Sequence, residues 1–299
     1  MKRLLIQLNS VILLLFAFSF YCMGADTYTL EYKLENGKTY KQSVVTSTKI
    51  KMDFMGQEMS VDMKSEVSVQ YNVLGQNNGV FDIRILYKKI KMSVSDPMPM
   101  NLNIDANSPD SSSEGEIFKL LIESSFDIQL TKLVKVLSVK GVDEFIEKIN
   151  TVGNPQLNAA LGQQISEKGI QTMIEQMSTF FPEKPVTIGE SWDMNQNLST
   201  NGIDIISKMK LTLKQVKDNI ATIDCIGTLT TPEGGAVTQI QGMDASVSVT
   251  GEQAGTILLD MKSGWIVRSD LNQKFTQNIE IMGQTMKQYF ESKTTVTAN

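Results

Sequence analysis

Five aspartates are the residues whose type and placement come nearest to a hydrolytic site. They lie in or beside segments that we predict to be strands, and they are Asp193, Asp204, Asp224, Asp244 and Asp260. Two carboxyl groups about 5–9 Å apart can cleave a glycosidic bond. Spacing along the chain does not bring any two of them to that distance. A carboxylate-based hydrolase is therefore one hypothesis, beside the interpretation that these acids lie on solvated strand faces and turns.

The absence of histidine removes most other catalytic chemistry. None occurs among the 299 residues, which excludes Ser-His-Asp and Cys-His catalysis and histidine-ligated metals. The two cysteines, Cys22 and Cys225, are too few for a thiolate zinc site or an iron–sulfur cluster. Because no cation neighbours Cys225 in sequence, we predict a small buried strand residue in preference to a reactive thiol. We expect no catalytic residues, no metal and no cofactor.

Methionine is the unusual feature of the composition, with 17 residues. Thioethers can bind Cu(I), and flexible methionine-rich surfaces can bind varied apolar ligands. Most of these methionines fall on the inward phase of predicted strands, which favours core filling over either site. Glycine clusters at 234–235 and 251–255 come between predicted strands and do not open a helix, so they do not predict a phosphate-binding loop.

Residues 1–24 have the pattern of a secretory signal. Residues 2–3 are basic, residues 11–20 are apolar, and cleavage is expected after Gly24 or Ala25. The apolar stretch is shorter than the ~20 residues that a bilayer-spanning helix requires, and we expect no membrane span once the signal is removed. The sequence therefore predicts an exported protein of the periplasm or cell envelope.

Cys22 offers a second interpretation of this segment, a lipidated cysteine. Against it, Tyr21 stands where the lipoprotein pattern requires a small side chain. The mature chain would lose two basic residues, so its net charge would move from −5 to −7. No run of lysine or arginine is present, and nucleic acid is therefore not an expected partner.

Strand patterns dominate the first half of the mature chain. Residues 58–73 alternate between apolar and polar side chains, which indicates a long antiparallel strand with one wet face. We predict further strands at 28–34, 39–54 and 80–94. In the last of these the apolar phase changes from odd to even numbers, which predicts a β-bulge near Lys88 and Lys89.

The centre of the chain is less regular. Residues 96–116 are rich in proline, serine and acids and predict a mobile loop, with no calcium-loop spacing. Short helices are expected at 116–123 and 142–149, around a hairpin at 126–139. Residues 154–182 predict a helical segment of two amphipathic helices packed on the sheet.

Residues 183–299 return to the strand pattern. We predict strands at 186–192, 205–214, 220–230, 237–249, 254–260, 265–281 and 286–296. The expected fold is mainly β (α+β), a large curved antiparallel sheet or half-barrel of long strands with a few amphipathic helices packed on it. The chain then divides into a signal at 1–24, a β-meander at 25–153, the helical segment at 154–182 and a β half at 183–299, although 25–299 could form one domain.

Four segments carry a resemblance to a known family. They are residues 30–40, 136–142, 181–192 and 251–256. With the signal, this layout resembles an uncharacterised family, a domain of unknown function, of exported β-rich Gram-negative envelope proteins. The shared residues are turn and strand-entry residues, so the resemblance implies a fold and no activity or site. At the level of architecture alone, the chain is also similar to half-barrel lipoprotein carriers of the periplasm, which hold lipid acyl chains.

Three functions are compatible with these features. The first is non-catalytic binding of a lipid, another apolar ligand or an envelope partner by a concave sheet closed by the 154–181 helices. The second is a structural module that binds protein through sheet edges or the 96–116 loop. The third is the carboxylate-based hydrolase. The length of the strands, the methionine-rich inward phase and the missing catalytic constellations favour the first.

Overall fold

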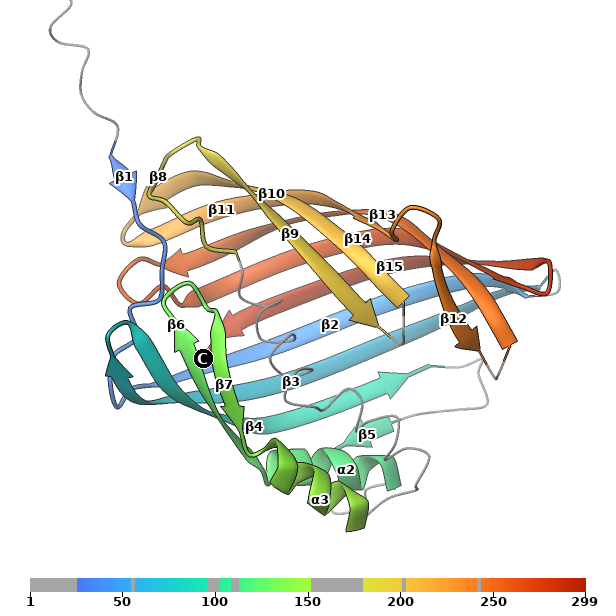
Figure 1. Cartoon of the computed structure of the whole chain (residues 1–299), viewed down its shortest axis with the longest axis horizontal. Coiled ribbons are helices and arrows are strands. Elements are labelled where there is room, and N and C mark those ends of the chain that lie inside the picture. The colour runs from blue at the N-terminus through green and yellow to red at the C-terminus, as the bar shows by residue number, and fades with distance from the viewer. Residues whose placement is uncertain are drawn as a thin grey trace, which may run out of the picture.

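The computed structural model describes residues 26–54, 57–95, 103–108, 113–151, 180–200, 203–240 and 243–299. Within these residues the chain forms one antiparallel sheet of 13 strands, a separate two-stranded pair and two short helices (Figure 1). The predicted fold class, a mainly β protein with a large curved sheet, is confirmed. The predicted signal and nearly all of the predicted 154–182 helical segment lie outside the described residues.

Nine long strands form the middle of the sheet. In spatial order they are β4 (Val80–Val94), β3 (Gln57–Asn77), β2 (Thr39–Phe54), β15 (Gln284–Ala298), β14 (Ile266–Ile281), β13 (Met243–Asp260), β11 (Ile220–Thr230), β10 (Ile203–Lys217) and β9 (Ser191–Thr200). The strands β2 and β15 pair from Gln42 and Ala298 to Met52 and Gln288. Strands from both predicted β halves therefore share one sheet, while the division at residues 153 and 183 stays a prediction.

Shorter elements complete the β4 side. As predicted, β6 (Ser125–Thr131) and β7 (Val136–Lys140) form a hairpin, and it extends the sheet beyond β4. The helices α2 (Ser113–Ile122) and α3 (Val142–Thr151) lie beside this edge (Figure 1). The side chains of Val142, Phe145 and Ile149 are buried, at the helical spacing that predicted α3.

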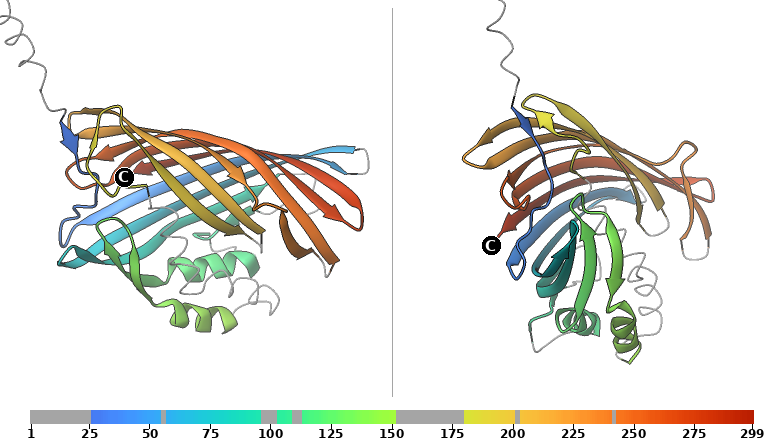
Figure 2. Two further views of the ribbon diagram at one scale, coloured as in Figure 1. Left: turned by 45° about the horizontal axis from the view of Figure 1, so that its top comes forward. Right: turned by 60° about the vertical axis from the view of Figure 1, so that its left-hand side comes forward.

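The two faces of the sheet differ in composition because side chains alternate along each strand. We call the face that carries Val69 and Tyr71 the inner face and the opposite one the outer face. Both edges of the sheet, at β9 and at β6–β7, curve toward the inner side (Figure 2). The predicted bulge is confirmed: Val69 pairs with Tyr87 and Ser68 with Lys89, which leaves Lys88 as the extra residue.

The segment predicted as a strand at 28–34 is not one. Strand β1 (Thr27–Tyr28) pairs only with β8 (Val186–Thr187), and the chain then runs across the end of the sheet. The amide of Tyr32 donates to the carbonyl of Lys132 (2.9 Å) and that of Lys33 to Ser263 (2.8 Å). These acceptors lie at the β6–β7 and β13–β14 turns. The alternation of buried side chains at residues 28–34 therefore comes from an extended segment that packs across the end of the sheet, and not from a hairpin strand.

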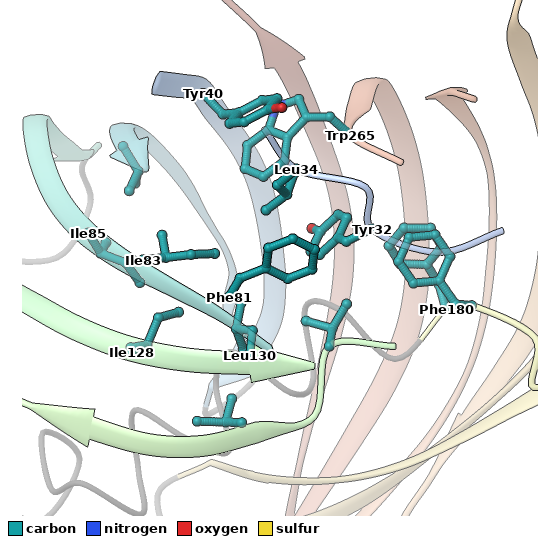
Figure 3. Packing of buried hydrophobic residues seen from close by; sticks show 14 of the residues in the cluster. Tyr32, Leu34, Tyr40, Phe81, Ile83, Ile85, Ile128, Leu130, Phe180 and Trp265 are labelled. Atoms are coloured by element: carbon teal, nitrogen blue, oxygen red, sulfur yellow. The ribbon is translucent and has the colours of Figure 1, made fainter. Parts of the chain in front are cut away.

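Trp265 is the centre of the core at this end of the sheet (Figure 3). Its ring packs on Tyr32 (centroids 5.8 Å apart), Tyr40 (4.9 Å) and Tyr71 (5.1 Å), and Tyr32 in turn meets Phe181 edge to face (5.3 Å). The preceding Gly264 has a φ of +70°, and a Cβ there would collide with the carbonyl oxygen of Glu31. The crossing segment and the sheet thus fit together through aromatic packing and one close backbone approach.

Three further expectations differ from the structure. The strand predicted at 186–192 is divided at a turn into β8 and the start of β9. The predicted loop at 96–116 contains β5 (Asn103–Asp105), which pairs with β4 and buries Ile104, and α2 starts earlier than expected, within the same range. The strands predicted at 237–249 and 254–260 are instead β12 (Ala236–Ile240) and the continuous β13. The glycines at 251–255 had indicated an interruption, but they lie inside a strand.

Gly251 is required by close backbone packing. A Cβ at this position would collide with the Cβ of Phe275 on β14, whereas a Cβ at Gly75 in β3 would meet only Asp82 Oδ2 at 3.5 Å. We expect Gly251→Ala to lower the free energy of unfolding by about 1–3 kcal/mol and Gly75→Ala to change it little, as measured by urea denaturation. Equal effects of the two substitutions would contradict this account of β13.

Burial of Tyr32 and Tyr71 predicts a loss of stability at alkaline pH. Burial raises the pKa of both phenols far above the ordinary value, so they ionise only when the protein unfolds. Their stabilising effect is complete below the unfolded pKa of about 10 and declines as pH rises above it. We expect Tyr71→Phe to remove about 2 kcal/mol of the decline between pH 10 and 11.5, and Tyr289→Phe, at an exposed tyrosine, to leave the profile unchanged.

Candidate functional site

The inner face of the nine long strands carries no charged side chain in the described residues. Its strand positions hold aliphatic, aromatic, methionine, cysteine, glycine, alanine, serine, threonine and glutamine residues. The outer face of the same strands is dense in lysine and acids. Such a difference is larger than the alternation of an ordinary half-buried sheet, in which edge and loop-facing positions include charges.

A line of uncharged polar side chains crosses the middle of the inner face. We call it the polar seam, and its members are Thr46, Thr48, Ser207, Gln253, Gln273, Ser292 and Thr294. The hydroxyls of Thr46 and Thr294 are 3.1 Å apart, and those of Thr48 and Ser292 are 2.9 Å apart. Both contacts cross the β2–β15 pairing, so the seam is continuous where the two halves of the chain meet.

The seam continues across β14, β13 and β10 through two glutamines. Gln273 donates from Nε2 to Gln253 Oε1 (3.1 Å), and Gln253 donates from Nε2 to Ser207 Oγ (2.7 Å). Strand β11 lies between β13 and β10, and the residue facing Gln253 on it is Gly227. Gln253 reaches Ser207 because Gly227 has no side chain, and a Cβ there would collide with the carbonyl oxygen of Lys208.

Several inner-face amides have hydrogen-bonding capacity that the described residues do not fill. Gln42 is 7% exposed, and its side chain has no hydrogen-bond partner in the described part of the chain. Gln277 and Gln288 face each other on β14 and β15, are half-buried, and likewise have no side-chain partner there. None of these amide atoms is fully enclosed by the described residues, so they are available to a molecule that lies on this face.

Apolar side chains flank the seam on both sides. Toward Trp265 they form the large core. On the other side a smaller cluster has Ala245, Val247, Val249 and Ile279 buried, with five half-buried residues packed against it: Ile203, Ile205, Phe275, Ile281 and Met286. Phe275 and Phe290 stack with their ring centroids 4.4 Å apart. This second cluster is less covered by the described residues than the first.

The aspartates considered as hydrolytic acids all lie away from this face. All five are on the outer face and are exposed or half-buried: Asp193, Asp204, Asp224, Asp244 and Asp260. The strand register does not place any two of them in a shared buried cleft. Burial alone would raise the pKa of Asp260, but hydrogen bonds from Ser263 and from the amide of Lys262 hold it below its usual value. That acid is an ionised turn residue.

Cysteine and possible metal ligands add no reactive group to the inner face. Cys225 is buried there, and burial, followed by the charge of Asp224, raises the pKa of its thiol. The thiol is therefore protonated at neutral pH. Cys225 is the small buried strand residue that the sequence predicted. Within the described ranges, no group of three or more His, Cys, Asp or Glu side chains could hold a metal ion.

Two shallow hollows lie on the outer face. One of about 830 Å³ crosses β9 to β14 and another of about 720 Å³ crosses β14 to β4, and both include Asn272 and Lys274. Their walls mix lysines with acids, including the ion pairs of Lys49 with Asp62 (3.6 Å) and Lys274 with Glu291 (3.9 Å). This mixture of charges is typical of a solvated strand face, so the inner face is the better candidate site.

One family model matches more than half of this chain. A family model described as a family of unknown function, DUF6263, matches residues 78–266. The chain belongs to the DUF6263 family. This confirms the expected membership of an uncharacterised family, and it assigns no activity. No curated protein matches the sequence.

Solved structures similar to this DUF6263 chain are distant. A structure titled "lipid–protein interactions in lipovitellin" has a TM-score of 0.49 at 9% identity, and covers 89% of this chain and 25% of that one. The Salmonella typhi OmpF complex with daunomycin has a TM-score of 0.25 at 8% identity, covering 89% and 99%. This chain therefore spans about a quarter of the lipovitellin chain, and likenesses this remote identify no ligand. No described helix has both the length and the apolar character to cross a membrane.

Breaking the seam tests whether it is a cooperative network. Ser207→Ala removes the acceptor for the side-chain amide of Gln253, a residue that is only 4% exposed. Because this leaves a buried donor without a partner, we expect the free energy of unfolding to fall by about 1–3 kcal/mol. Ser43→Ala is the matched control, because the Ser43 hydroxyl makes only a 3.4 Å contact with Ser68 on the outer face. The same loss in both variants, measured by urea denaturation, would refute the network.

Proposed function

We propose that this protein binds an apolar ligand on the inner face of its sheet and performs no catalysis. The observation that carries this proposal is the complete lack of charged side chains at the inner positions of the nine long described strands. An apolar molecule that lies on this surface displaces no counter-ion and leaves no buried charge unpaired. The same surface gains from burying its exposed aliphatic and aromatic area.

The second apolar cluster is the part of the face where such a ligand would gain most. Phe275, Ile281 and Met286 are each half-buried, so covering them removes further apolar area from water. The core around Trp265 has little apolar area left to cover, because Leu211, Leu213 and Leu259 are already fully buried. Binding over β13, β14 and β15 is therefore favoured over binding at the Trp265 end.

The cellular setting belongs to the same proposal. The signal pattern at residues 1–24 supports export to the periplasm or cell envelope, where apolar lipids and envelope proteins are available partners. A hydrolase is a weaker candidate, because the five aspartates that could have supported it are on the outer face. The described residues give no specific observation that favours the protein-interaction module.

A neutral apolar dye tests the proposed face directly. We expect N-phenyl-1-naphthylamine to bind the full chain saturably, with a rise in fluorescence, and Phe290→Ser to weaken this binding at least fivefold. Tyr289→Ser is the matched control. Tyr289 immediately precedes Phe290 in β15, is 47% exposed and lies on the outer face. No saturable binding by the folded protein, or equal loss in both variants, would overturn the proposal.

A further inference from the structure

We propose that the ligand of the inner face is electrically neutral where it meets the sheet: a long-chain molecule whose polar part is an ester, alcohol or amide, and not an ionised carboxylate or phosphate. This inference rests on the proposed function, since it specifies the ligand class for the same face. It uses three features: the distribution of charge, the unpartnered amides, and the position of two of these amides beside the second apolar cluster.

The distribution of charge disfavours an anionic head group. The nine ion pairs of the described residues use no inner-face strand position; those near the seam, such as Lys49 with Asp62 and Lys274 with Glu291, are on the outer face. An ionised carboxylate or phosphate that left water for the inner face would find no lysine or arginine at the strand positions that the structure describes there. Its lost hydration would have no compensating charge, and such a transfer is strongly unfavourable.

The unpartnered amides favour a neutral polar group. Gln277 and Gln288 are half-buried, lie beside the second cluster and have no side-chain hydrogen-bond partner among the described residues. Gln42 is a third such unpartnered amide, more buried, on the Trp265 side of the seam. Each amide can donate to a carbonyl or hydroxyl oxygen and accept from a hydroxyl. Esters, alcohols and amides can satisfy these groups, and a saturated hydrocarbon cannot.

The order of side chains along β14 suits a long chain that carries one polar group. From the seam outward, its inner positions are Gln273, Phe275, Gln277, Ile279 and Ile281. At ~3.4 Å per residue, this run is about 27 Å long, enough for a long acyl chain parallel to the strands. The polar group would lie against Gln277 and Gln288, in the middle of this run. The chain would lie along the strands, over Phe275 and Phe290 or over Ile279.

Two ligands with the same chain and different charge test the inference on the full protein. Displacement of N-phenyl-1-naphthylamine by methyl oleate is compared with displacement by oleate at pH 9, below the critical aggregation concentration of each. We expect methyl oleate, and also monooleoylglycerol, to bind at least tenfold more tightly than oleate. Oleate binding as tightly as its methyl ester would overturn the inference while leaving the proposed function intact, whereas failure of all three to bind would overturn the proposed function itself.

A charge placed on the inner face provides a second measurement. Gln288→Lys should raise the ratio of oleate to methyl oleate affinity at least tenfold, because the carboxylate then has a cation on the face. Thr285→Lys, on the outer face of the same strand, should leave the ratio unchanged. Gln277→Lys makes the same substitution on β14 and replaces Gln288→Lys if that variant does not fold, as judged by circular dichroism. An unchanged ratio in the folded inner-face variant would also overturn the inference.

Discussion

The antiparallel pairing of β2 with β15 is the interaction on which the rest of the structure depends. It joins the first long strand to the last, and it places strands from both ends of the chain in one sheet. Without it, the inner face would be two separate surfaces, each with an exposed strand edge. With it, Thr46 meets Thr294 and Thr48 meets Ser292, so the seam and the apolar areas beside it become one continuous surface.

The seam and the glycines of β11 and β13 have a common physical basis. A sheet with this curvature brings neighbouring backbones close on its inner side, and Gly227, Gly251 and Gly255 are positions where no Cβ would fit. The missing side chain of Gly227 is what allows Gln253 to cross β11 and reach Ser207. Polar groups that would otherwise be buried without partners thus satisfy one another, without introducing a charge.

Much of the fold was predictable from the sequence, because period-2 alternation is a strong signal. It identified β3, placed β11 at Ile220–Thr230 and located the bulge at Lys88. It failed at residues 28–34, because an extended segment that crosses the end of a sheet has the same alternation as a strand. It also failed at Gly251 and Gly255, because glycine that permits close packing cannot be distinguished by type from glycine that ends a strand.

The candidate site was harder to predict than the fold. Gln253, Gln273 and Ser207 interrupt the apolar phase of their strands, and without the register such interruptions look like noise. The signal that could have identified the face was the lack of lysine, arginine and acids at inner positions in strand after strand, which needs only the phase of each strand. The neutral residues of different strands form one line because of long-range strand pairing. A local sequence pattern does not specify which strands pair or in which register.

Native mass spectrometry of the protein purified from the cells that produce it tests the central claim most directly. The account predicts a fraction of the folded protein carrying a bound molecule, released on activation as an uncharged lipid with a long acyl chain. Protein that carries only acidic lipids, or that carries no ligand after gentle extraction in several mild detergents, would contradict the claim that the neutral inner face is a binding surface.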